Sequence, residues 1–175
     1  MGNAEVLPFP DCSFEIVLSR LAFHHFPNRG KPFAEMVRVL KPGGKLVIID
    51  MEAAEEPLRA VEDELEQMRD PSHVRNLSLA EMQEMYAYYG MTIPTCEMTK
   101  MPVVLQNWLD LTQTPSDIQK EITRRLQEEL QGGQKTGFYP YCKDEKILIR
   151  PSLDSPDRDQ SGTVTGKKGA ETADG

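Results

Sequence analysis

Two adjacent histidines, His24 and His25, are the side chains of this sequence best suited to proton transfer, because imidazole titrates nearest to neutral pH. They lie between Phe23 and Phe26. A neutral imidazole here could accept a proton from a hydroxyl or a carbon acid. The pair could equally cap or pack an aromatic loop. Adjacent residues seldom converge on one ion and no third ligand follows nearby, so we predict no metal site.

Other charged side chains could line a pocket for a small substrate. Asp50 ends an apolar run, and His73 and Arg75 follow Asp70 in a loop between two expected helices. That loop could close over a substrate as a lid, although charged loop residues are more often solvated surface. Both interpretations stay open for Asp50, His73 and Arg75.

Hydrophobic spacing predicts the elements that position these residues. Residues 14–20 and 45–50 are short apolar runs of the kind covered on both faces of a parallel sheet. Between them, apolar residues spaced i, i+3, i+4 and i+7 predict a helix over 32–40, and the Lys-Pro-Gly-Gly sequence at 41–44 ends it. Strand, helix and strand form a βαβ unit with parallel strands. The predicted fold class is therefore α/β.

The carboxyl ends of the two predicted strands are the expected ligand site. Ser19 and Arg20 end the first strand, and Asp50 ends the second. Ligands of open α/β sheets bind outside the carboxyl ends of the strands. His24 and His25 follow at the lip of the same crevice.

Helix and strand patterns alternate from there to residue 150. Ser78 and Glu81 form a capping box that begins a helix. Two prolines make the β-rich stretch 92–104 an irregular edge strand. Further helices are predicted at 57–69 and 115–130, and further strands at 138–142 and 146–149.

Composition changes sharply at Pro151, where Ser, Asp, Gly, Thr, Lys and Pro become dominant. Such a segment cannot bury enough apolar surface to offset the entropy of ordering it. We therefore predict a domain over residues 1–150 and a disordered tail over residues 151–175.

The charge and the cysteines limit the class of partner. The chain carries 28 acidic and 20 basic residues, a net charge of −8, which argues against nucleic acid or an anionic membrane as the main partner. No apolar run approaches the ~20 residues that a membrane helix needs. Its three cysteines are far apart in the sequence, which fits a reducing cytoplasm and gives no disulfide framework.

One combination of motifs resembles a known family. The motifs are N-A-E-V-L-P-F-P-D-C-S-F-E-I-V-L-S at 3–19, F-H-H-F at 23–26 and M-V-R-V-L-K-P-G-G-K-L at 36–46. Together they resemble the second half of a class I S-adenosylmethionine-dependent methyltransferase domain. The similarity is to the branch that includes the ubiquinone and menaquinone biosynthesis enzymes. A looser similarity continues to about residue 150.

The resemblance implies S-adenosylmethionine as the cofactor and assigns roles to four residues. In such enzymes an acid at the position of Asn3 accepts a hydrogen bond from the adenine amino group, and the backbone amide at Ala4 binds a ring nitrogen. Asparagine keeps the acceptor oxygen without the charge. Ser19 and Arg20 would lie against the methionine moiety and the transferred methyl group.

The glycine-rich strand-to-helix turn of that family is not in this sequence, nor is the acid that binds the ribose hydroxyls. Both would lie upstream of Met1, so the expectation is a partial Rossmann-like fold that requires an N-terminal half or a partner chain. The glycines at 43–44 cannot replace the turn, because they follow a helix and precede a strand.

Methyl transfer to a small-molecule acceptor is therefore the predicted function of the complete fold. Histidines 24 and 25 are the predicted acceptor-side catalytic residues. The alternative is an inactive, truncated methyltransferase-like fragment that acts at most as a protein-interaction module.

Overall fold

The computed structural model describes residues 2–98, 101–150 and 162–168, and the chain falls into two compact units. The first comprises Met1–Asp50, Leu77–Glu97 and Gly162–Gly175, and the second comprises Met51–Asn76 and Met98–Ser161. The sequence predicts one domain over residues 1–150, whereas this division separates those residues between two units.

The first unit is built on a four-stranded sheet with the order β1-β2-β7-β3. Its strands are β1 (Phe14–Arg20), β2 (Leu40–Asp50), β7 (Gly162–Lys168) and β3 (Met91–Met98). The pairing of β1 with β2 is parallel and that of β2 with β7 is antiparallel, so the sheet is mixed. The α/β fold class is confirmed.

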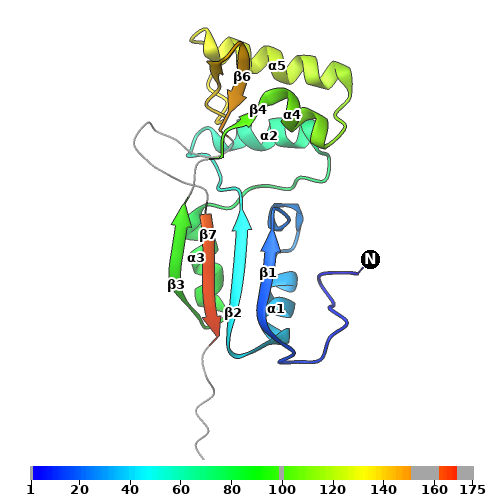
Figure 1. Ribbon diagram of the computed structural model, residues 1–175, viewed down its shortest axis with the longest axis vertical. Coiled ribbons are helices and arrows are strands. Elements are labelled where there is room, and N and C mark those ends of the chain that lie inside the picture. Colours follow the sequence, from blue (N-terminus) through cyan, green and yellow to red (C-terminus); the bar gives the residue numbers. More distant parts are fainter. Residues whose placement is uncertain (1, 99–100, 151–161, 169–175) are drawn as a thin grey trace, which may run out of the picture. The chain divides into compact units, whose positions relative to one another are not determined.

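Two helices, α1 (Gly30–Val39) and α3 (Leu79–Tyr88), lie against one face of this sheet (Figure 1). The predicted capping box begins α3, since Ser78 accepts a hydrogen bond from the Glu81 amide and the Glu81 side chain accepts one from the Ser78 amide. After α1 the chain reverses at Gly43, whose φ of 76° favours glycine. This βαβ connection brings the carboxyl ends of β1 and β2 to the same edge.

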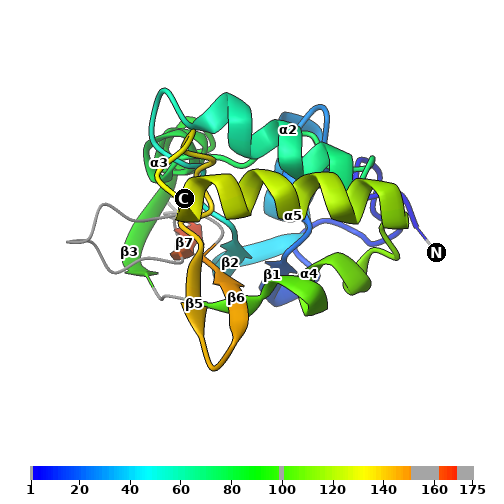
Figure 2. The same ribbon diagram turned by 90° about the horizontal axis from the view of Figure 1, so that it is seen from above.

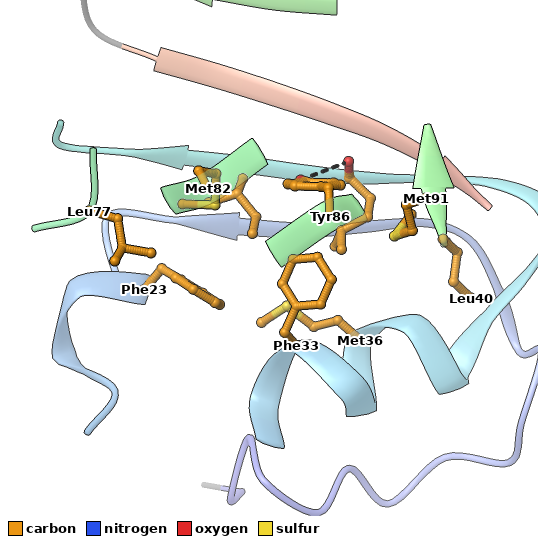
Figure 3. Close-up of a cluster of buried hydrophobic side chains, with 10 residues drawn as sticks. Phe23, Phe33, Met36, Leu40, Leu77, Met82, Tyr86 and Met91 are labelled. Carbon is orange, nitrogen blue, oxygen red and sulfur yellow. Dashed lines mark hydrogen bonds between the residues drawn. The ribbon is translucent and has the colours of Figure 1, made fainter. Parts of the chain in front are cut away.

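The core of the first unit fills the space between the sheet and both helices (Figure 3). The ring of Phe33 from α1 lies edge-on to Tyr86 from α3, with centroids 5.1 Å apart. Burial raises the pKa of Tyr86, whose hydroxyl donates to the Leu46 carbonyl of β2 at 3.3 Å. The core therefore ties α1, α3 and β2 together, and β2 carries Asp50 at its end.

The second face of β1 is open within the described residues. The side chains of Ile16 and Leu18 are 63% and 58% exposed. The prediction that both faces of this strand are covered is therefore wrong for this part of the chain. The apolar run was interpreted as that of a central strand, but the described residues of the first unit supply helices for one face alone.

The second unit packs helices against a three-stranded sheet with the order β4-β6-β5 (Figure 2). Its core takes residues from α2, α4, α5 and β6, including Leu65, Trp108, Leu126 and Ile149. The bounds are α2 (Arg59–Arg69), β4 (Val103–Val104), α4 (Leu105–Leu111), α5 (Ser116–Leu130), β5 (Tyr141–Lys143) and β6 (Lys146–Ile149).

Two predictions about elements need correction. The stretch 92–104 is not one edge strand, because β3 belongs to the first sheet and β4 to the second. The predicted disorder of 151–175 is wrong for Gly162–Lys168, which form β7 along β2. A polar strand is ordered there because β2 and β3 lie on either side of it. The rest of 151–175 lies outside the described residues.

None of the described helices is long and apolar enough to span a membrane.

Candidate functional site

The carboxyl ends of β1 and β2 form the candidate site. Ser19 pairs with Ile48 and Arg20 with Ile49 in the parallel register, and the Leu21 amide continues the ladder by donating to the Ile49 carbonyl at 2.8 Å. Ser19 is buried and Arg20 is exposed, as alternation along a strand requires. The predicted positions at the end of β1 are therefore confirmed as strand-end residues, while their role stays a prediction.

A short 3₁₀ helix, η1 (Phe23–His25), follows β1 directly. Its first residue, Phe23, is fully buried and contacts the rings of Phe26 and Phe33 edge-on, at centroid distances of 5.6 Å and 6.2 Å. Because Phe23 is anchored in the core, the next two residues are held just beyond the end of β1. His24 and His25 lie beside each other, with ring centroids 4.1 Å apart.

The Asp50 carboxylate links the end of β2 to η1. One carboxylate oxygen accepts hydrogen bonds from the backbone amides of Phe23 and His24, at 2.7 Å and 3.1 Å. The other lies 2.5 Å from Nδ1 of His24. The side chains of Asp50 and His24 are 6% and 10% exposed. The structure therefore brings together the candidates His24 and Asp50, which the sequence assigned to separate roles.

Asn3 and Ala4 lie in a turn near the amino terminus. The Asn3 side-chain oxygen accepts a hydrogen bond from the Glu5 amide at 2.9 Å, and the Asn3 carbonyl accepts one from Val6 at 3.1 Å. The oxygen predicted to face adenine therefore also closes this local turn.

The segment that follows the turn is fixed on α1 by Glu35 and Arg38. Glu35 accepts a hydrogen bond from the Leu7 amide at 2.7 Å, and Arg38 donates to the carbonyls of Leu7 and Phe9. The two hydrogen bonds from the Arg38 guanidinium lower the pKa of Glu35 to about 2, with a further contribution from the Leu7 amide.

His73 and Arg75 belong to the second unit, whereas Asp50 belongs to the first. His73 is buried, and its Nε2 lies 3.0 Å from a carboxylate oxygen of Asp63 on α2. This histidine is therefore not the solvated surface group that its loop position favours. Its assignment to a substrate pocket, with Arg75 and Asp50, stays a prediction.

Comparisons with known proteins agree with this architecture. The family profile described as a methyltransferase domain matches residues 1–48. The uncharacterized methyltransferase YcgJ of Bacillus subtilis is 39% identical over 126 residues, which cover 71% of this chain and 50% of that protein. The crystal structure of YcgJ has a TM-score of 0.78 and 30% identity, and the match covers 96% of this chain and 69% of that one. The chain belongs to the class I S-adenosylmethionine-dependent methyltransferases.

A second solved structure supports the same fold. A putative methyltransferase of Bacillus halodurans has a TM-score of 0.78 and 26% identity, over 97% of this chain and 76% of that one. The chain spans about half the length of the curated relatives it matches, at 50% for YcgJ and 56% for the protein YafE of Escherichia coli.

The glycine-rich turn between a strand and a helix that the family resemblance leads us to expect is not found in the sequence of this chain. A cavity of about 330 Å³ lies in the second unit, lined by residues that include Glu64, Arg124 and Arg125, and none of the predicted cofactor residues lines it. The candidates Ser19, Arg20 and His24 instead lie at or just beyond the carboxyl end of β1, beside the end of β2.

Sequence reasoning missed the contact between Asp50 and His24. The sequence did indicate that the two residues lie near each other. An acid at the end of one strand and a loop after the parallel neighbouring strand lie at the same edge of the sheet. The sequence alone could not show that the carboxylate reaches η1, since the turn at Leu21 (φ 47°) sets where the loop lies.

Proposed function

We propose that this chain is the acceptor-facing part of an enzyme that transfers a methyl group from S-adenosylmethionine to a small molecule. The observation that carries the proposal is the placing of His24 by Asp50 beyond the carboxyl ends of two parallel strands. Membership of the family supports methyl transfer as the reaction. The carboxyl ends of the strands are where ligands of open α/β sheets bind, so we expect the acceptor there. The cofactor provides an activated methyl group, so these residues mainly orient the acceptor and hold protons.

A fusion protein tests this proposal. The amino-terminal part of Bacillus subtilis YcgJ, up to the residue where its match to this chain begins, is placed ahead of Met1, and S-adenosylmethionine binding is measured by isothermal titration calorimetry. We expect micromolar binding by the fusion and very weak binding by the chain alone, because the family resemblance places the glycine-rich turn in the added part. A fusion that folds without binding the cofactor would contradict the proposal. Micromolar binding by the chain alone would show that the added part is not needed.

A second candidate function is a protein-interaction module. The exposure of Ile16 and Leu18 on β1 favours it, because an open apolar strand is a surface that other chains can cover. The same titration separates the two functions, since a pure interaction module gains no cofactor binding when the YcgJ part is added.

A further inference from the structure

The carboxylate of Asp50 and the ring of His24 form a pair with a defined direction. A carboxylate is an acceptor only, so the 2.5 Å contact between Asp50 and Nδ1 requires a proton on Nδ1. Neutral imidazole carries one ring proton, and the contact therefore fixes the tautomer. In this tautomer Nε2 is the ring nitrogen with the acceptor electron pair.

The same carboxylate is itself held in place by the backbone. Its other oxygen accepts from the amides of Phe23 and His24, and Phe23 is fully buried. The two hydrogen bonds from the backbone amides of Phe23 and His24 are sufficient to connect Asp50 of β2 to η1. The bond to the imidazole ring is additional, and it fixes the tautomer and the orientation of the ring.

We infer that Asp50 is a positioning residue that holds His24 with Nε2 ready to take a proton from the methyl acceptor. The acceptor then belongs to the class whose reacting atom carries a proton. The proton passes to Nε2, and the electron pair of the broken bond stays on the acceptor for the incoming methyl group. The imidazolium that forms is paired with the Asp50 carboxylate. The claim that the proton comes from the methyl acceptor rests on the proposed function. The claim about the tautomer of His24 depends on this chain alone.

Asp50→Asn gives a sharp test, because an amide has one acceptor oxygen and one donor nitrogen. If the oxygen stays on the backbone amides of Phe23 and His24, the amide nitrogen faces Nδ1 and donates to it. The ring proton must then move to Nε2. The variant therefore keeps the shape of the carboxylate and reverses the tautomer.

Nitrogen NMR of the labelled 175-residue chain measures this directly. Long-range correlations between ring protons and ring nitrogens are recorded at about pH 8.5, well above the ordinary histidine pKa of about 6.5, and His25→Ala assigns the signals. We expect a proton on Nδ1 of His24 in the wild type and on Nε2 in Asp50→Asn. The matched control is Asp63→Asn, which changes a second histidine–carboxylate pair, with His73, and should leave His24 unchanged.

Two results would overturn the inference. One is a wild-type His24 with its proton on Nε2, which needs no variant and so does not depend on how any variant folds. The other is the wild-type tautomer in Asp50→Asn, with the methyl signals of Leu46 and Ile48 showing that the first unit is folded. Neither measurement involves the cofactor, so a failure here is distinct from a fusion that binds no S-adenosylmethionine.

Discussion

At the scale of residues, two histidine–carboxylate pairs differ in setting. His24 faces Asp50 beyond the ends of two parallel strands, with 10% of its side chain exposed. His73 faces Asp63 with 2% of its side chain exposed, within a unit that has its own core. A general base must reach a bound molecule. Both histidines are paired with a carboxylate, so it is the position of His24 at the edge of the sheet that distinguishes it, as a candidate site residue, from His73, which we interpret as a packing residue.

Replacing His24 and His25 together with alanine should lower acceptor turnover by at least roughly tenfold in the fusion protein. The reason is that the double variant removes the predicted proton acceptor and its neighbour while leaving Phe23 in the core. Cofactor affinity should change little, since the main cofactor contacts are expected in the added part. Turnover kinetics and cofactor titration check this. Unchanged turnover would make the pair structural, and a parallel loss of cofactor affinity would assign it to the cofactor site.

Glu62 of α2 is a buried acid that should affect the pH dependence of stability. It is fully buried, and one of its oxygens accepts from the Ala54 amide at 2.7 Å, while its other oxygen has no hydrogen-bond partner among the described residues. Burial raises its pKa from 4.5 to about 8, and the neighbouring carboxylates of Glu66 and Asp63 add to the effect. The folded chain therefore favours the protonated form.

The contribution of Glu62 to stability should fall as pH rises from about 4.5 to about 8. The folded state binds the proton more tightly than the unfolded state, so the contribution is full below 4.5 and lost above 8. Glu62→Gln, which cannot ionise, should remove this dependence and raise the free energy of unfolding at pH 8 by about 1–3 kcal/mol. Urea denaturation at several pH values measures it, with Glu55→Gln in an exposed loop as the control. Equal slopes for Glu62→Gln and the wild type would contradict this account.

At the scale of elements, β7 is the strand that sequence reasoning did not find. Its neighbour in space is Tyr86 of α3, because a Cβ added at Gly166 would lie 2.1 Å from that ring. The ring therefore needs a glycine beneath it, and the glycine-rich composition that indicated disorder has a packing reason at this position.

Gly166→Ala should destabilise the first unit by about 1–3 kcal/mol, the usual range for overpacking a core. For a chain of this length that lowers the melting temperature by roughly 2–4 °C per kcal/mol. Thermal unfolding followed by circular dichroism checks it, and Lys167→Ala, at an exposed position on the same strand, should have little effect. A melting temperature unchanged in Gly166→Ala would show that Tyr86 does not pack on β7.

Local rules predicted β1, α1, β2 and the capping box of α3, because each depends on side chains close together in the sequence. The order β1-β2-β7-β3 could not be predicted in the same way. The position of β7 depends on a pairing with β2 more than a hundred residues earlier, and its own residues have little apolar pattern. The same holds for the candidate site. The residues at the strand ends were predictable from the sequence, whereas the contact between the Asp50 carboxylate and the His24 ring was not.

At the scale of the whole molecule, the open face of β1 is the feature that the described residues leave unexplained by packing. Each strand of a central sheet normally buries apolar side chains on both faces when helices cover both. Ile16 and Leu18 are exposed on β1, while Val17 and Ser19 face the helices. The chain covers about half the length of its curated relatives. We therefore expect the part of a methyltransferase domain that this chain does not match to pack on this face of β1.

The double variant Ile16→Thr, Leu18→Thr tests that expectation. Threonine has the β-branched shape that strands favour and a smaller apolar area, so the chain alone should keep its fold and associate less at high concentration. In the fusion protein the same change should lower the melting temperature by several degrees, because the added part would then pack on a polar strand. Light scattering of the chain and thermal unfolding of the fusion are the measurements. Leu111→Thr, which removes another exposed apolar side chain from the second unit, is the matched control. If the fusion tolerates the β1 variant as well as it tolerates the control, this face is not covered in the complete domain.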